Sequence, residues 1–193
     1  MELIRQPISI IGEVTVTQSY GKSMIKQNVF HNTITNRLAR GLTYMITERF
    51  FGSGSGENIN DYIPQYIGLG ASNEGDNDFN LSPNTLKDEY KGNGTTIDRF
   101  KINSKIPDLA GGAVNYASAT LRTFIAPGDM KDGYIIRELG LFTTDGTNPA
   151  TANTMLARVR IDNADQITKL PGTAIDIVWN IIVAPSTDIY SVN

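Results

Sequence analysis

The chain offers few residues from which a catalytic site could be assembled, and its single histidine is the first limit. A Ser or Thr nucleophile needs a base, which is most often a histidine. His31 is the only histidine, and it lies directly before a helix-like pattern. We interpret it as a residue at the entry to that helix. The chain has no cysteine, which excludes disulfides and thiolate metal sites.

Motifs for binding phosphate or metal ions are equally poorly supported. The glycine-rich segment 52–56 lacks the lysine that a phosphate-binding loop requires. Residues 71–84 are rich in Asn, Asp and Glu, and clustered oxygens can bind calcium. Their spacing does not supply the glycine and final glutamate of an EF-hand, so a solvated loop is the favoured interpretation. We therefore predict a protein that is not an enzyme and that binds no cofactor or metal.

One pair of charged residues stands out because it interrupts an apolar run. Residues 135–142 read Ile-Ile-Arg-Glu-Leu-Gly-Leu-Phe, so that Arg137 and Glu138 lie within a strand of core type. Charges of this size are rarely buried without partners. We expect them to pair with each other or to face solvent. Gly140 indicates a bulge or a close backbone approach, and Asp145-Gly146 predicts a turn.

Apolar alternation predicts the strands that must position these side chains. They are expected at residues 8–17, 23–30, 66–70, 95–106, 113–125, 135–142, 155–161 and 174–184. Pro107 is expected to end the strand that precedes it, and a change of phase between Ala117 and Ala119 indicates a bulge. Trp179 is expected in the core. Apolar residues at helical spacing predict one helix over residues 33–51.

These elements predict a mainly β protein, an antiparallel β-sandwich with one accessory α-helix and long loops. Residues 1–30 are expected to form an N-terminal strand arm or hairpin, residues 31–184 the sandwich domain with its helix at 33–51, and residues 185–193 a C-terminal tail. The length of 193 residues suits one domain with such appendages.

Charge and hydropathy make two kinds of partner improbable. The net charge is −3 and the Lys and Arg residues are scattered, which argues against nucleic-acid binding. The sequence contains no run of about 20 apolar residues that could span a membrane, and its early apolar run is too short for a signal peptide. We expect neither nucleic acid nor membrane as a partner.

Several short motifs, taken in order, resemble those of tailed-bacteriophage virion proteins. They are QNVFHNTITNRLARGL, YIGLGAS, LKDEY, IIRELGLFTTDG, MLARVRI and ITKLPGTAIDIVWNIIV. In that order they are similar to the N-terminal region of tail-collar fibre proteins and related baseplate or appendage proteins. The match includes a Leu-x-x-Glu element that ends at Glu89, and a Lys-x-x-Gly turn that begins at Lys169.

The resemblance implies a structural role in the virion, a particle that is assembled in the host cytoplasm. The chain would be an oligomeric adaptor of the tail, baseplate or collar, with copies of itself in a ring or trimer and other virion proteins as partners. Arg137, Glu138 and Glu89 would then be candidates for interaction within the fold or between subunits. Fibre proteins continue into a shaft and a receptor-reading tip, so a chain that ends here favours an adaptor over receptor binding. A head decoration protein and, less favoured, a carbohydrate-binding sandwich are the alternatives.

Overall fold

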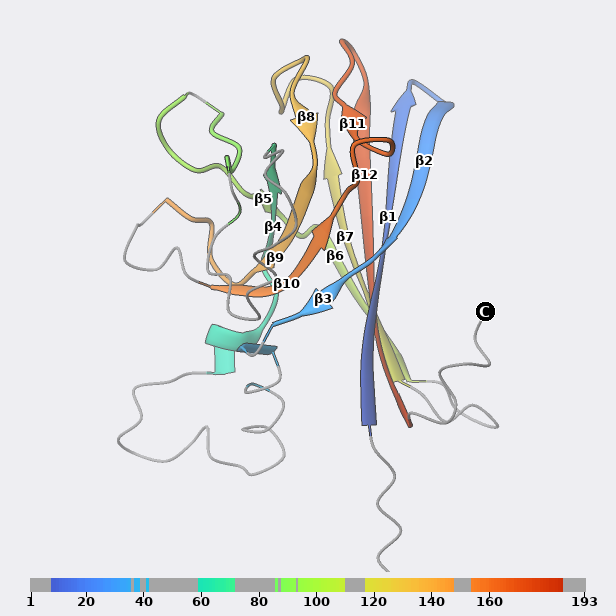
Figure 1. Ribbon diagram of the computed structural model, residues 1–193, viewed down its shortest axis with the longest axis vertical. Coiled ribbons are helices and arrows are strands. Elements are labelled where there is room, and N and C mark those ends of the chain that lie inside the picture. The colour runs from blue at the N-terminus through green and yellow to red at the C-terminus, as the bar shows by residue number, and fades with distance from the viewer. Residues whose placement is uncertain are drawn as a thin grey trace, which may run out of the picture.

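The protein is mainly β, and all of its paired strands are antiparallel (Figure 1). It is described here from a computed structural model. The structure describes residues 8–35, 37–38, 41, 59–71, 86, 88–92, 94–109, 117–147 and 154–185. The predicted fold class is confirmed.

The first sheet contains the long strands of the molecule, and β12 is its central strand. In spatial order it consists of β2 (Ser23–His31), β1 (Ile8–Tyr20), β12 (Ala174–Pro185), β7 (Ala117–Ile125) and β6 (Ser104–Leu109). Strand β12 pairs with β1 on one side and with β7 on the other. Its backbone is therefore hydrogen-bonded along both edges, which leaves β2 and β6 as the edges of the sheet.

The second sheet has shorter strands and lies beside the first, to its left in Figure 1. In spatial order it consists of β3 (Thr33–Ile34), β10 (Met155–Arg160), β9 (Glu138–Phe142), β4 (Tyr66–Gly70) and β5 (Phe100–Lys101). Two further short strands, β8 (Ile135–Ile136) and β11 (Ile167–Thr168), pair with each other. A 3₁₀ turn, η2 (Ile59–Tyr62), precedes β4.

One hydrophobic cluster fills the space between the two sheets. It joins Val14 and Trp179 of the first sheet to Leu69, Leu139 and other residues of the second. Trp179 is fully buried, as its sequence position predicted. Because alternate residues of each strand point to this cluster, the arrangement is that of a sandwich.

Most of the predicted strands are confirmed, but the strand expected at residues 95–106 is wrong. There the chain forms β5, which pairs with β4 in the second sheet, and then β6, which pairs with β7 in the first. Pro107 does not end a strand; it lies within β6 and pairs with Ala119. An edge strand tolerates proline because the missing N–H is not needed by a neighbour.

Two other local predictions are also corrected. The pairing of β7 with β12 and β6 runs through residues 117–119 without a shift, so the expected bulge is absent there. The predicted strand 135–142 is interrupted at Arg137, where the chain passes from β8 to β9. The turn at Asp145-Gly146 is confirmed, since Gly146 has a φ of 81° and Thr147 N donates to Asp145 Oδ1 at 3.0 Å.

The predicted helix starts later than expected, because Thr33–Ile34 forms strand β3. Residues 37, 38 and 41 are helical, and the rest of the predicted helix lies outside the described residues. The hairpin that the sequence set apart at residues 1–30 supplies β2 and β1 of the first sheet. Most of loop 71–84 and residues 186–193 lie outside the described part.

None of the helical segments that the structure describes is long and apolar enough to cross a membrane.

Candidate functional site

The three residues singled out in the sequence, Arg137, Glu138 and Glu89, meet at the end of β4. Gly70 pairs with Glu138 in the sheet and forms an isolated bridge with Glu89. The backbone N–H of Arg137 donates to Gly70 O at 2.9 Å. The fold therefore brings together backbone segments that are far apart in the sequence, although each side chain then takes a different partner.

The side chain of Glu89 forms a buried ion pair with Arg99. Arg99 Nε lies 2.6 Å from Glu89 Oε1 and Nη2 lies 3.2 Å from Oε2, a two-pronged contact. Both side chains are almost completely shielded, with 0% and 2% of their surface exposed. Arg99 Nη1 also donates to Thr144 O at 3.1 Å. The pair ties residues 89 and 99 to the loop after β9.

The ring of Phe142 forms the floor beneath this ion pair. Arg99 Cζ lies 3.5 Å from the centre of the ring, which adds a cation–π attraction. The ring has room because β4 and β9 have paired glycines, Gly68 and Gly140. A Cβ at Gly140 would lie 2.4 Å from Phe142 Cε2, and one at Gly68 would lie 2.6 Å from Glu89 Oε1. Of the two meanings predicted for Gly140, the close approach is the one observed.

Arg137 and Glu138 do not pair with each other. The buried carboxylate of Glu138 instead pairs with Arg158 on the neighbouring strand β10. Arg137 donates to Gln166 Oε1 through Nη2 at 2.7 Å and through Nε at 3.0 Å, and to Ala71 O at 3.3 Å. Arg137 lies between β8 and β9 whereas Glu138 begins β9, and their side-chain partners come from different elements. Both side chains thus cross-link parts of one chain.

Two further polar side chains, the half-buried Tyr134 and the buried Lys169, make internal hydrogen bonds that the sequence did not indicate. The single hydroxyl proton of Tyr134 is shared between Asp88 O at 2.9 Å and Leu69 O at 3.3 Å. Burial, followed by the nearby carboxylates of Asp88 and Glu89, raises the pKa of Tyr134 well above its usual value of 10. The hydroxyl therefore stays protonated and remains a donor.

Lys169 begins the Lys-x-x-Gly turn and is completely buried. Its ammonium donates to Pro127 O at 3.1 Å, to Leu170 O at 3.1 Å and to Asp132 Oδ1 at 3.0 Å. Three acceptors match the three donors of an ammonium. The motif position was visible in the sequence, but a lysine there gives no sign of burial.

His31, Arg99 and Arg158 show what the sequence did and did not indicate. His31 ends β2 with an exposed side chain on the first sheet. Arg99 and Arg158 are anchors of the two ion pairs, yet in the sequence each occupies an ordinary polar position of a strand pattern. Only the known partner, Glu89 or Glu138, could have suggested them.

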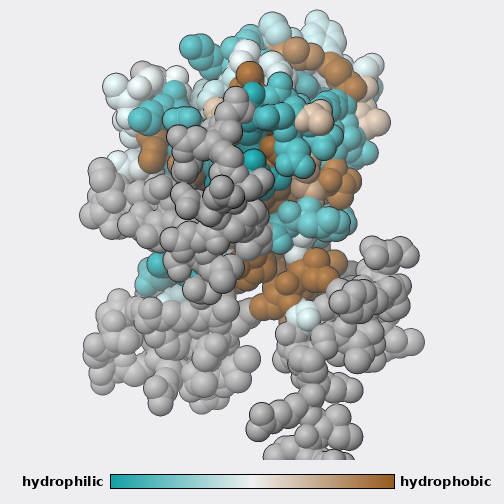
Figure 2. Space-filling view, viewed as in Figure 1, coloured by the Kyte–Doolittle hydropathy of each residue, from teal (hydrophilic) through white to brown (hydrophobic). Residues whose placement is uncertain are grey.

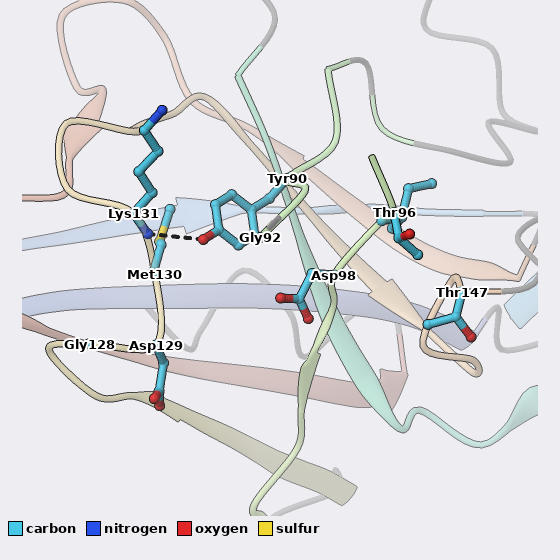
Figure 3. A pocket seen from close by; sticks show the side chains of 10 residues that line it. Tyr90, Gly92, Thr96, Asp98, Gly128, Asp129, Met130, Lys131 and Thr147 are labelled. Carbon is cyan, nitrogen blue, oxygen red and sulfur yellow. Dashed lines mark hydrogen bonds between the residues drawn. The ribbon is translucent and has the colours of Figure 1, made fainter. Parts of the chain in front are cut away.

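A hollow of about 610 Å³ opens between residues 90–98 and the turn that follows β7 (Figure 3). It is lined by Tyr90, Gly92, Thr96, Ile97, Asp98, Gly128, Asp129, Met130, Lys131 and Thr147. The Tyr90 hydroxyl accepts a hydrogen bond from Lys131 N at 2.9 Å, and burial raises the pKa of Asp98. Its charged side chains can hold a polar group, but the ten lining residues include no histidine or cysteine to act as base or thiol nucleophile.

The part of the chain that the structure describes contains no group of three or more His, Asp or Glu residues placed to hold a metal ion. Comparison of the chain with protein-family models, with curated proteins and with solved structures finds no match.

Proposed function

We propose that this protein is a structural component of a tailed-bacteriophage virion, an oligomeric adaptor of the tail, baseplate or collar. The proposal starts from the ordered motifs of the sequence. The positions of three of these motifs in the fold support the proposal. The segments YIGLGAS, IIRELGLF and MLARVRI supply β4, β9 and β10, three adjacent strands of the second sheet. A set of motifs that assembles into one packed layer fits a common structural module.

The observation that carries the proposal is the internal use of the buried charges. Glu89 and Glu138 each pair with an arginine, and Lys169 pairs with Asp132. The Glu138 pair joins β9 to β10, and the other two pairs join segments outside the named strands. An adaptor must keep its shape while other proteins dock to it, and in our proposal these ion pairs help to select one conformation. In this proposal Arg137, Glu138 and Glu89 serve cohesion of the fold, the first of their two predicted roles, and the docking surfaces lie elsewhere.

The proposal is tested by locating the chain in particles of the phage that encodes it. Cryo-electron microscopy of intact particles should show the sandwich at the tail, baseplate or collar, in a few tens of copies or fewer, arranged with the symmetry of the tail. Hundreds of copies on the capsid would instead identify a head decoration protein. Absence from purified particles would contradict both roles.

A further inference from the structure

The edge strand β2 differs from every other sheet edge that the structure describes. The edges of the second sheet, β3 and β5, have two residues each. The opposite edge of the first sheet, β6, contains Pro107 and the exposed Lys105. Short strands, proline and lysine are the usual means by which proteins prevent edge-to-edge pairing. β2 has nine residues, no proline and an open outer edge among the described residues. Its one lysine, Lys26, is directed to the loop before β11.

The backbone of β2 presents its free hydrogen-bonding groups at alternate residues. Asn32 N donates to Gly12 O at 3.0 Å, which sets the phase of the antiparallel ladder between β2 and β1. Hydrogen-bonded and non-bonded residues alternate in such a ladder, so Phe30 and Asn28 also direct their backbone N–H and C=O groups to β1. His31, Val29 and Gln27 therefore direct their N–H and C=O groups away from β1, to the open edge.

The segment that is able to pair is short and symmetric about Val29. A bulge at Gln18/Ser19, opposite Ile25, interrupts the regular ladder at one end. At the other end the chain leaves for β3 after His31. This leaves Gln27, Val29 and His31 as the regular outward-facing residues, with Val29 at the centre.

The side chains of this segment are compatible with a second copy of the same strand. With Val29 opposite Val29 of the other copy, Gln27 lies opposite His31 and Lys26 opposite Asn32, so no lysine faces a lysine. Val29 is 55% exposed although it is apolar, and it would be covered by its own counterpart. Figure 2 shows hydrophobic residues among hydrophilic ones on the side of the molecule where Figure 1 places β2.

The strand is also held in place, so its edge is preformed. Lys26 Nζ donates to Asp165 O at 3.3 Å and to Gln166 O at 3.0 Å, and Asn28 Nδ2 donates to Asp165 O at 3.3 Å. These contacts fix the inner side of β2 to the loop before β11. A strand that is already ordered loses less entropy on pairing.

We propose that β2 pairs antiparallel with β2 of a second copy of this chain, about a two-fold axis at Val29, and joins the two first sheets edge to edge. The contact is the same surface on both partners and uses main-chain hydrogen bonds as in strand addition. It goes beyond the proposed function, because it does not require a virion and would hold for the isolated protein. An edge contact of this size is small, so dimerisation should depend on protein concentration.

Proline at the centre of the edge provides the first test. The Val29 N–H faces the open edge, so Val29→Pro should leave the ladder with β1 intact and remove both hydrogen bonds of the central pair between chains. The dimer dissociation constant should rise about tenfold or more in sedimentation velocity over a concentration series. Val29→Thr, which keeps the N–H and suits a strand, is the matched control and should dimerise like the wild type.

Cross-linking gives a second test that does not depend on the proline variant folding. The chain has no cysteine, so a single cysteine can report on one contact. Directly opposed residues of a hydrogen-bonded pair have Cα atoms about 5.5 Å apart, within the reach of a disulfide. Val29→Cys should therefore form a disulfide-linked dimer on mild oxidation. Ile106→Cys, at a similarly exposed position of the other edge strand, should not.

Hydrogen exchange gives the most specific readout, because it follows individual amides. Raising the protein concentration should protect the amides of Gln27, Val29 and His31 while leaving those of Asn28 and Phe30, already bonded to β1, unchanged.

The proposal is overturned if the wild type stays monomeric to about 200 μM, a concentration at which a dissociation constant of tens of μM gives mostly dimer. A dimer that Val29→Pro leaves intact, or cysteines at 29 and 106 that cross-link equally, would also overturn it. None of these results bears on the location of the chain in a particle, so the two proposals can fail separately.

Discussion

The Glu89–Arg99 ion pair illustrates, at the level of single residues, how a buried charge can be essential without being the main source of stability. Removing two charges from water costs several kcal/mol for each ion, and their attraction offsets this only when the geometry is good. Here the two-pronged contact, the Thr144 carbonyl and the Phe142 ring surround the guanidinium. The pair therefore depends on both members being present.

This dependence predicts a non-additive pair of substitutions. Arg99→Met leaves the Glu89 carboxylate buried without its cation and should lower the free energy of unfolding by about 3–5 kcal/mol. Glu89→Leu should cost a similar amount, and the double variant should cost markedly less than the sum, with a coupling of about 1–3 kcal/mol. Urea unfolding of the four proteins measures the cycle. Additive costs would mean that the two side chains do not stabilise each other.

Tyr134 predicts a loss of stability at alkaline pH. Burial and the neighbouring carboxylates raise the pKa of Tyr134 in the folded state above its usual value of 10. The folded protein therefore keeps a proton that the unfolded chain releases above pH 10, and the free energy of unfolding falls as the pH rises beyond that point. Well below pH 10, where the tyrosine is protonated in both states, this group contributes no pH dependence.

The contribution of Tyr134 can be isolated by comparison with Tyr134→Phe. That variant loses the two hydrogen bonds of the hydroxyl and should be less stable at pH 7 by about 1–3 kcal/mol, but its stability should fall less steeply between pH 10 and pH 11. Tyr20→Phe, at an exposed position, serves as control. Parallel stability curves for wild type and Tyr134→Phe would show that the hydroxyl does not titrate differently in the folded state.

At the level of elements, the sequence predicted strands well wherever a strand stays in one sheet. β1 and β12 have apolar residues at alternate positions where they face the core, as at Val14 and Val16 of β1 and Trp179 of β12. The prediction failed at residues 95–106, where the chain crosses from the second sheet to the first. The alternation in the sequence continues across that crossing, so the pattern carries no sign of the change of partner.

A local sequence pattern does not reveal which element a residue contacts, and this also explains how much of the candidate site the sequence indicated. Arg137 and Glu138 were noticeable because they interrupt an apolar run, whereas Arg99 and Arg158 occupy positions where a charged residue is ordinary. Their contacts follow from tertiary pairing: Arg99 is buried against Glu89 of a separate segment, and the half-buried Arg158 meets Glu138 of the neighbouring strand. No local pattern encodes such a contact, so half of each ion pair was invisible until the fold was known.

The glycine pair of β4 and β9 leads to a prediction at this scale, because it determines how closely a ring can pack on two strands. Gly140→Ala would place a Cβ against the Phe142 ring, which is fully buried and itself packed against Arg99. The ring cannot shift without disturbing the ion pair, so the substitution should cost about 1–3 kcal/mol. Gly128→Ala is the control, because a Cβ there meets nothing within 4 Å. Equal stability of the two variants in urea unfolding would contradict the packing argument.

For the whole molecule, the decisive feature is that the two sheets share one hydrophobic cluster. The cluster includes residues of β1, β7 and β12 together with residues of β4, β9 and β10. Neither sheet can leave the other without exposing the apolar face of both. The hairpin of β1 and β2 belongs to the same unit, since β1 pairs with β12 along almost its whole length.

This shared core predicts that the two sheets unfold in a single cooperative transition. Trp179 is the only tryptophan of the chain and lies fully buried in the first sheet, so its fluorescence reports on that sheet and on the interface. Far-ultraviolet circular dichroism reports on the strands of both sheets. The two signals should follow one urea curve with the same midpoint, because a two-state transition gives coincident curves with different probes. An earlier loss of dichroism than of fluorescence would show that the second sheet unfolds first and that the core does not join the two layers into one unit.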